Sequence, residues 1–226
     1  MPTYFVTGID TDAGKSFATG LMAKYLQERG ENITTQKFAQ TGCQGISEDI
    51  LAHREIMGIE PTKWDCEGTT CPYVFNYPAS PHLAASLENQ RIEVQRITES
   101  TNVLEENFDY LLIEGVGGIY VPINDDITLL DYVEKMKYPL ILVTSSKLGS
   151  INHTLLTLEI AYKRKLPIQG VIYNHYPNDS EIILKDSIKV FRRFLDQFGY
   201  DCPIIEIPKF EKGEAPNVDF GLFFTN

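Results

Sequence analysis

The sequence predicts an α/β fold with three layers, in which helices cover both faces of a central, mostly parallel sheet. Short apolar runs alternate with longer helical patterns along the chain, which is typical of βαβ units. Two of these runs, 111–113 and 140–143, are apolar at every position, as expected of strands that are covered on both faces. The chain has 226 residues, and because a domain typically has ~150, we expect a single domain over residues 1–226.

The individual elements follow from the same patterns. The expected strands are Tyr4–Thr7, Thr34–Phe38, Tyr110–Glu114, Leu140–Thr144, Gln169–Tyr173 and Pro203–Ile207. The expected helices, which carry apolar residues at helical spacing, are Lys15–Arg29, Ile151–Lys163 and Glu181–Phe198. Gly30 is expected to stop the first helix. Basic side chains on the last helix lie opposite an apolar stripe, which indicates an ordinary solvated face rather than an anion-binding patch.

The net charge limits the partners that the protein can have. The chain has 20 Lys and Arg residues against 31 Asp and Glu residues, a net charge of −11. Such a surface repels polyanions, so we expect neither nucleic acid nor a membrane as a partner, and a phosphate site must be local. No apolar run approaches the ~18 residues of a membrane span, and the N-terminus does not resemble a signal peptide, so we expect a cytoplasmic protein.

The segment Gly8–Ser16 joins the first strand to the first helix and reads Gly-Ile-Asp-Thr-Asp-Ala-Gly-Lys-Ser. In this context it predicts a phosphate-binding loop (P-loop), because backbone N–H groups and the helix N-terminus point at one spot. Lys15 is expected to reach the β- and γ-phosphates of a nucleotide, and the Ser16 hydroxyl to bind Mg²⁺. Five residues separate Gly8 from Gly14, one more than in the common pattern. The alternative is an ordinary glycine turn followed by a surface lysine.

Two acidic residues, Asp10 and Asp12, lie within this loop. Their charge would repel a triphosphate, which indicates that a cation, either a metal ion or an amine, also binds here. In the alternative interpretation, Asp10 accepts hydrogen bonds from loop amides and Asp12 is solvated.

The carboxyl ends of the strands are the expected place for a ligand, as in other open parallel sheets. We therefore expect Lys37–Thr41, Glu114–Gly118 and Ser145–Ser150 to share one crevice with the loop. Glu114 ends an apolar strand, where P-loop proteins keep an acidic residue for Mg²⁺, and the alternative is a solvated carboxylate. The glycines that follow it either let a ligand approach the backbone or serve a tight turn.

Five motifs, in this order, resemble those of the dethiobiotin synthetases, the ATP-dependent enzymes of biotin synthesis. They are Gly8–Ser16 with its five-residue spacing, Lys37–Gly42, Ser80–Ala85, Glu114–Gly118 and Lys147–His153. The resemblance implies a P-loop NTPase fold and a reaction of 7,8-diaminononanoate, CO₂ or bicarbonate, and ATP. The diamine forms a carbamate, ATP converts the carbamate to a mixed anhydride, and the second amine closes the ureido ring. The products are dethiobiotin, ADP and phosphate.

The resemblance also implies roles for individual residues. Catalytic roles fall to Thr11, Lys15 and Lys37. Nucleotide binding falls to Asp12, Ala13, Gly14, Lys15, Ser16, Phe17, Glu114, Gly117, Asn174 and Pro208. Substrate binding falls to Thr41, Gly118, Gly149, Ser150, Ile151 and Asn152, the last four of which would hold the substrate carboxylate across the interface of a homodimer. The implied Mg²⁺ ligands are Ser16, Asp49 and Glu114.

Three points stay open at the level of the sequence. Glu48 adjoins Asp49, so either carboxylate could face the metal. Ser150 or Asn152 could simply cap its helix. The segment Lys209–Glu214 departs from the family pattern, which leaves the base preference of the nucleotide site open.

Three other functions are compatible with a P-loop. A partner-regulated switch ATPase of the related class usually has a second lysine early in the loop, whereas Ile9–Asp12 has none. A small-metabolite kinase would release a phosphorylated product without cyclisation. A catalytically inactive nucleotide-binding protein is disfavoured because Lys15, Ser16, Lys37 and Glu114 are all present.

Overall fold

The computed structural model describes residues 2–177, 180–209 and 215–224. Its centre is a six-stranded sheet in the order β2–β5–β1–β6–β7–β8, in which every neighbouring pair is parallel. The strands are β1 (Thr3–Gly8), β2 (Ile33–Lys37), β5 (Tyr110–Gly118), β6 (Leu140–Ser145), β7 (Ile168–Asn174) and β8 (Ile204–Ile207). Two short strands, β3 (Gln40–Thr41) and β4 (Val74–Phe75), form a separate parallel pair.

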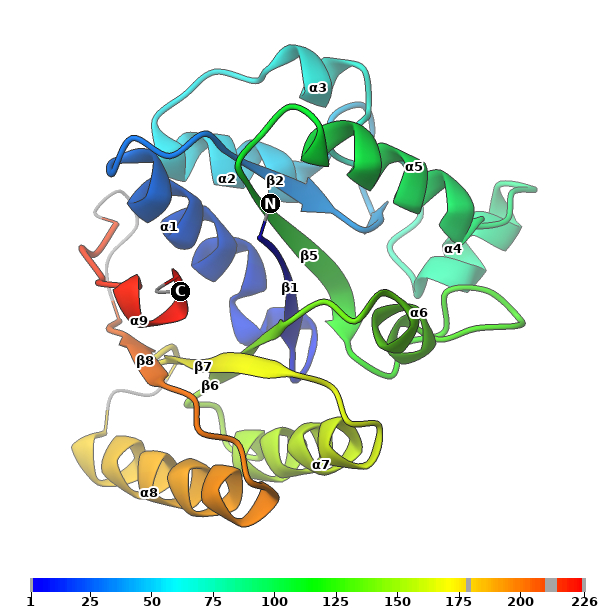
Figure 1. Ribbon diagram of the computed structural model, residues 1–226. Coiled ribbons are helices and arrows are strands. Elements are labelled where there is room, and N and C mark those ends of the chain that lie inside the picture. Colours follow the sequence, from blue (N-terminus) through cyan, green and yellow to red (C-terminus); the bar gives the residue numbers. More distant parts are fainter. Residues whose placement is uncertain (1, 178–179, 210–214, 225–226) are drawn as a thin grey trace.

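Helices cover both faces of the sheet (Figure 1). One face packs against α1 (Lys15–Gln27), α2 (Glu48–Met57) and α9 (Gly221–Phe224). The other face packs against α5 (Val94–Glu105), α6 (Leu129–Met136), α7 (Ser150–Lys163) and α8 (Glu181–Phe198). The remaining short helices are η1 (Thr11–Ala13), α3 (Lys63–Cys66) and α4 (Pro81–Leu87). The predicted three-layer α/β/α fold around a parallel sheet is therefore confirmed.

The apolar runs of the sequence are the reason for this layering. In β5, Leu111 and Ile113 pack into the α5 and α6 side of the core, while Leu112 packs into the α1 side. All three side chains are fully buried. A strand with apolar residues at successive positions buries both faces only if helices lie on each side of it.

The strand β5 extends further than the sequence indicates, through Gly118 rather than to Glu114. A Cβ at Gly115 would lie 2.9 Å from the ring of Phe5, and Gly118 pairs with Gly8 of β1 after a shift in register. The glycines therefore continue the strand against a neighbouring aromatic ring and against the start of the loop. The interpretation of Gly115–Gly118 as a tight turn is wrong.

Several smaller expectations can be compared with the described residues. Helix α1 ends at Gln27, two residues before the expected Arg29, and α7 begins at Ser150, one residue before the expected Ile151. The four cysteines, of which only Cys66 and Cys71 lie close together in the sequence, are expected to be reduced thiols. All four are free in the structure, and three of them are buried. Among the helices that the structure describes, none has the length and apolar character needed to cross a membrane.

Candidate active site

The loop between β1 and α1 is shaped by Gly14. This residue has a φ of +95°, and a Cβ there would lie 2.4 Å from Nδ2 of Asn174 at the end of β7. Glycine is required for two reasons. Residues with a side chain rarely adopt this φ, and Asn174 occupies the space that a Cβ would need. Asn174 in turn donates from Nδ2 to the carbonyl of Ala13, at 3.2 Å, and accepts from the Tyr176 amide at 3.0 Å. The loop is thus attached to the opposite half of the sheet.

Lys15 opens α1 and is buried. Its Nζ donates to the carbonyl oxygens of Asp10, at 2.9 Å, and Thr11, at 3.2 Å, so the ammonium group lies inside the curve of the loop. Burial, reinforced by the charge of Lys37, lowers the pKa of Lys15 to about 8. The Asp10 carboxylate accepts from the Thr11 amide at 2.8 Å, as in the loop-amide interpretation of this residue.

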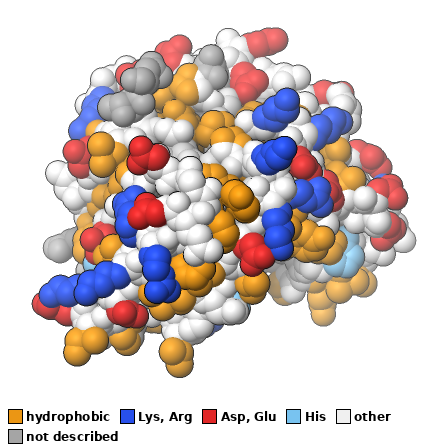
Figure 2. Space-filling model, turned by 60° about the horizontal axis from the view of Figure 1, so that its bottom comes forward, with side chains coloured by type: hydrophobic (Ala, Val, Ile, Leu, Met, Phe, Trp, Pro, Cys, Tyr) orange, Lys and Arg blue, Asp and Glu red, His pale blue; other side chains and the backbone are white. Residues whose placement is uncertain are grey.

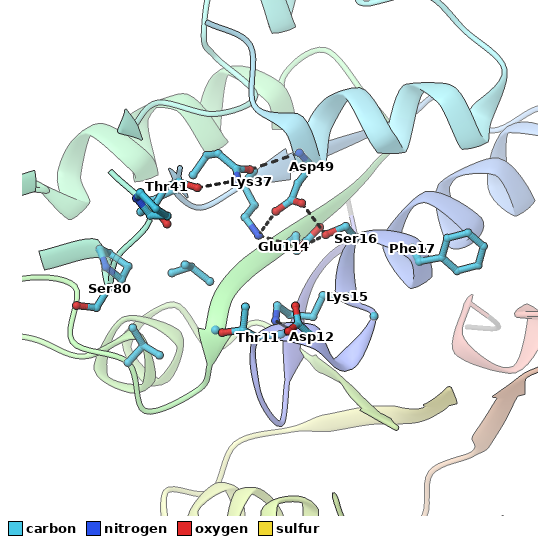
Figure 3. A pocket seen from close by; sticks show the side chains of 18 of the residues that line it. Thr11, Asp12, Lys15, Ser16, Phe17, Lys37, Thr41, Asp49, Ser80 and Glu114 are labelled. Atoms are coloured by element: carbon cyan, nitrogen blue, oxygen red, sulfur yellow. Dashed lines mark hydrogen bonds and ion pairs between the residues drawn. The ribbon is translucent and has the colours of Figure 1, made fainter. Parts of the chain in front are cut away.

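Three oxygen atoms from distant parts of the chain converge next to Lys15 (Figure 3). The Ser16 hydroxyl lies 2.8 Å from Asp49 Oδ1 and 2.9 Å from Glu114 Oε1. Hydroxyl and carboxylate oxygens are the donors that Mg²⁺ prefers, and this ion is usually held by one or two carboxylates together with substrate phosphates. The described residues contain no cluster of three or more His, Cys, Asp and Glu side chains arranged for a metal ion. The set therefore fits Mg²⁺ bound together with a nucleotide and does not fit a dedicated metal cage.

Helix α2 decides which carboxylate points at this site. Ser47 caps the helix by accepting from the Ile50 amide at 3.3 Å, which sets the rotation of the first turn. In this register Glu48 is exposed, whereas Asp49 faces Ser16 and Lys37. Of the two neighbours, Asp49 is therefore the carboxylate that lies in this cluster.

Lys37 ends β2 and is 4% exposed. Its Nζ lies 2.5 Å from Asp49 Oδ2 and 2.8 Å from Glu114 Oε1, and it donates to the Gly115 carbonyl at 3.0 Å. Burial by itself would lower the pKa of Lys37, but the charges of Glu114 and Asp49 outweigh it and hold the pKa above the usual range. Lys37 therefore carries its positive charge at any working pH.

Glu114 is fully buried at the centre of this cluster. Burial would raise its pKa, but the charge of Lys37 and a hydrogen bond from His53 outweigh that effect and hold the pKa below the usual range. His53 Nε2 lies 2.7 Å from Glu114 Oε2, on the side away from Ser16. The sequence interpretation did not include His53, although it lies one helical turn after Asp49 and so shares its face of α2.

A cavity of about 850 Å³ at the carboxyl ends of the strands is lined by Lys15, Ser16, Lys37, Asp49 and Glu114. Twelve of the residues to which a role is assigned above line it: Thr11, Asp12, Gly14, Lys15, Ser16, Phe17, Lys37, Thr41, Asp49, Glu114, Gly117 and Asn174. Residues without an assigned role also contribute, notably Pro78–Pro81 before and at the start of α4, Val121 and Tyr176. The expected crevice therefore exists between the loop and the strands β2 and β5, but the expectation that Ser145–Ser150 shares it is wrong. Ser145 and Lys147–Ser150 line a separate, smaller hollow.

The other assigned residues lie outside this cavity. Gly149 and Ser150 line a smaller hollow with Asp12, and Gly118 lines an open surface pocket of about 480 Å³ next to α7. Pro208 directly follows β8 and is exposed. Ala13 is buried within the loop, and Ile151 and Asn152 lie in the first turn of α7. The divergent residues 210–214 lie outside the described residues.

The first turn of α7 settles one open point. The residue that caps this helix is Gly149, with a φ of +95°, and no side chain accepts from the first amides. Ser150 Oγ contacts Ser145 Oγ at 3.0 Å instead. The interpretation of Ser150 or Asn152 as a simple helix cap is wrong. The Ser150 amide donates to the Lys147 carbonyl at 3.0 Å, and the first turn of a helix leaves further backbone N–H groups without helical partners, to which an anion can bind.

Comparison with known proteins places this geometry in a family. A family model described as an AAA domain matches residues 2–210. The chain is 52% identical to the ATP-dependent dethiobiotin synthetase BioD 2 of Pasteurella multocida, over 87% of this chain and 92% of that protein. It is 45% identical to the ATP-dependent dethiobiotin synthetase BioD of Chlorobaculum tepidum, over 89% and 85% of the two chains.

Solved structures resemble the fold at much lower identity. A ParA family ATPase from Chlorobium tepidum has a TM-score of 0.54 at 17% identity, with 93% of this chain and 85% of that chain covered. The MinC:MinD cell division complex of Aquifex aeolicus has a TM-score of 0.56 at 15% identity, with 94% and 83% covered. Such likeness shows the fold alone, whereas the identity to the curated relatives is high over most of both chains. The chain therefore belongs to the dethiobiotin synthetase family.

Proposed function

We propose that the protein is an ATP-dependent dethiobiotin synthetase, which joins CO₂ to 7,8-diaminononanoate and closes the ureido ring. The observation that carries this proposal is the convergence of Lys15, Lys37, Ser16, Asp49 and Glu114 at one end of the cavity. The two lysines can hold two anions close together, and the oxygen cluster can hold a divalent cation beside them. A reaction that brings a carbamate to the γ-phosphate of ATP needs both.

In this proposal the loop binds the triphosphate. The backbone N–H groups from Asp12 to Phe17 would hold the phosphates together with Lys15, and the N-terminus of α1 adds a partial positive charge. Asn174 keeps one amide N–H and further acceptor capacity free for the adenine base beyond its contacts to Ala13 and Tyr176. Pro208 would border the base at the end of β8.

Ser16, Asp49 and Glu114 would hold Mg²⁺ in the same site. When bound, this ion neutralises phosphate charge during transfer. The three residues come from α1, α2 and β5, so folding of the sheet and both helices is needed to bring them together.

Lys37 and Thr11 would lie next to the carbamate. Because its pKa is raised, Lys37 stays an ammonium ion and cannot act as a general base. Its role is electrostatic: it offsets the negative charge where the carbamate oxygen meets the phosphate. Thr11 lines the cavity across from Lys37, and Thr41 lines it on the side of β3, where the diamine would lie.

Each step of the reaction can be written with a nucleophile from the substrate, so no nucleophile from the protein is needed. One amine nitrogen attacks CO₂ and loses a proton, which gives the carbamate. A carbamate oxygen then attacks the γ-phosphorus, and ADP leaves. The second amine attacks the carbamoyl carbon, phosphate leaves, and a second proton is lost. This last step is intramolecular, and such reactions reach effective molarities of about 10⁵–10⁸ M, so no strong base is required.

The substrate carboxylate would bind the first turn of α7 of a second copy of the chain. Gly149 and Asn152 are exposed and Ser150 is buried, and Gly149 and Ser150 line a hollow outside the main cavity that shares Asp12 with it, which supports a site completed by a homodimer. Tyr120 and Leu156, which line the open pocket beside α7, are 63% and 58% exposed, and Leu148, in the loop before α7, is 99% exposed. Figure 2 shows the side of the molecule that carries α7 and α8, where hydrophobic side chains lie among charged ones. Several large apolar side chains exposed close to one helix support an interaction site there.

The proposal is tested by the dependence of ATP turnover on both other substrates. Purified protein with Mg²⁺ and ATP should release ADP and phosphate only when 7,8-diaminononanoate and bicarbonate are both present. Turnover that ignores the diamine and responds instead to a protein or DNA partner would identify a switch ATPase.

A further inference from the structure

The fully buried histidine of helix α2 has no role in the reaction outlined above. His53 is 0% exposed, and it is the buried one of the four histidines, all of which the structure describes. Both of its ring nitrogens are paired: Nδ1 lies 2.9 Å from Thr35 Oγ1, and Nε2 lies 2.7 Å from Glu114 Oε2. A polar ring in this position is costly to bury unless both hydrogen bonds are made.

The direction of these hydrogen bonds follows from the neighbours. Glu114 is a carboxylate ion-paired with Lys37, so its Oε2 can only accept, and His53 Nε2 must carry a ring proton and donate it. Thr35 Oγ1 accepts from Arg54 Nη1 at 3.0 Å and has its own proton to donate to Nδ1 of the neutral ring. Arg54 is itself fixed by a two-pronged contact to the buried Asp65, with Nε and Nη2 at 2.9 and 2.8 Å from its carboxylate oxygens. The donors thus point in one direction, from Arg54 through Thr35 and His53 to Glu114.

This arrangement fixes the rotation of the Glu114 carboxylate. The terminal torsion of a glutamate is broad, so contacts alone decide where its two oxygens lie. His53 takes Oε2, while Oε1 faces the Ser16 hydroxyl and the Lys37 ammonium group. We propose that His53 is a positioning residue, which donates from Nε2 to Oε2 of Glu114 and thereby presents Oε1 to the Mg²⁺ site. The inference rests on the proposed Mg²⁺ site and not on the identity of the diamine.

A purely structural role for His53 predicts a different result. If His53 only filled space between α2 and the sheet, an apolar side chain of similar volume would leave the metal site intact. If it positions Glu114, the loss of its donor should weaken Mg²⁺ binding, because groups that orient a metal ligand typically contribute about 10- to 100-fold to metal affinity. A glutamine should preserve the effect, since its amide nitrogen can take the place of Nε2.

The experiment measures ADP binding by calorimetry as a function of Mg²⁺ concentration, without diamine or bicarbonate. For His53→Leu we expect the Mg²⁺ concentration at half-maximal effect to rise by about 10- to 100-fold, with ADP affinity in EDTA unchanged. His53→Gln should stay close to the unaltered protein. The matched control is Thr101→Val, which removes a buried hydrogen bond to Gln36 on the opposite side of the sheet and should leave the Mg²⁺ dependence unchanged.

Three results would overturn the inference. The first is a folded His53→Leu protein with unchanged Mg²⁺ dependence, and the second is an equal shift for the leucine and glutamine variants. The third comes from the unaltered protein and does not depend on any variant folding: nitrogen NMR of labelled histidine should show the His53 ring protonated at Nε2. A ring protonated at Nδ1 alone could not donate to Glu114. A protein that responds to Mg²⁺ through His53 yet makes no dethiobiotin would refute the proposed function and leave this inference standing.

Discussion

Lys37, the last residue of β2, and Glu114, in the middle of β5, are register partners, and their side chains form a buried ion pair with Nζ 2.8 Å from Oε1. The pairing of two parallel strands therefore places a positive charge against a negative charge in the wall of the cavity. Asp49 of α2 adds a second carboxylate on the same ammonium group. The chemistry proposed for the site depends on this arrangement, and each prediction below alters one part of it.

Removal of the Lys37 charge should stop the reaction while sparing the nucleotide. Lys37→Ala should lower kcat for dethiobiotin formation by at least about 10²–10³-fold, the usual cost of removing one group that stabilises developing charge. ADP affinity, measured by calorimetry, should change little, because the loop and Lys15 remain. Lys24→Ala, on the solvent side of α1, is the control for loss of a lysine as such. Full activity of Lys37→Ala would show that the end of β2 has no catalytic part.

The neighbouring acids of α2 offer a matched pair of variants. Asp49→Asn should raise the Mg²⁺ concentration needed for half-maximal activity by at least about tenfold, because it removes a carboxylate from the oxygen cluster. Glu48→Gln removes the same charge one position earlier, on an exposed side chain, and should have little effect. The comparison is made from Mg²⁺ titrations of initial rate. Equal effects of the two variants would mean that only the general acidity of α2 matters.

Lys15 should make nucleotide binding depend on pH. Its pKa in the free protein is lowered to about 8, first by burial and then by Lys37. The phosphates bind the charged form, so the lysine is ready below this pH, and above it the protein must take up a proton in order to bind. The Kd of ADP should therefore rise by up to about tenfold per pH unit above the pKa of Lys15.

Calorimetry at pH values on both sides of that pKa, in buffers of different ionisation enthalpy, measures the proton uptake directly. Lys15→Arg keeps its charge throughout this range and serves as the comparison, since any pH dependence that remains in it belongs to other groups. A Kd for the unaltered protein that is independent of pH from neutrality upward would contradict the role given to Lys15.

The exposed apolar residues beside α7, Tyr120 and Leu156, should lie at an interface between two copies of the chain. Leu156→Glu places a charge on it and should yield monomers in sedimentation experiments, with a higher KM for the diamine because the turn Gly149–Asn152 of the second copy is lost. Leu222→Glu is an equally simple change on α9, at the other face of the sheet, and should leave the assembly unaltered. If the unaltered protein sediments as a monomer and is fully active, the proposed shared site is wrong.

The parts of this site that are local in sequence could be predicted from the sequence. The loop Gly8–Ser16 and the acid Glu114 after the apolar run of β5 follow from short motifs next to apolar strands, whose burial depends on few long-range details. The continuation of β5 through Gly118 could not, because it depends on the pairing of Gly118 with Gly8 and on the ring of Phe5 against Gly115.

The same distinction explains why His53 was missed. Its contacts join residues 18 and 61 positions apart, Thr35 and Glu114, and become visible only when α2 lies across the sheet. If residues 48–57 are taken as a helix with Asp49 facing the metal, His53 lies on the same face, one turn later. That periodicity was the one available signal, and it requires the beginning of α2 to be known to the residue.

The most direct test of the proposed function is the fate of the carbon atom of bicarbonate. The protein is incubated with ¹³C-labelled bicarbonate, unlabelled 7,8-diaminononanoate, ATP and Mg²⁺, and the products are analysed by mass spectrometry. We predict dethiobiotin that carries the label in its ureido carbon, with ADP and phosphate formed in equal amounts to it. ADP and phosphate without labelled dethiobiotin, or a phosphorylated product that does not cyclise, would contradict the account.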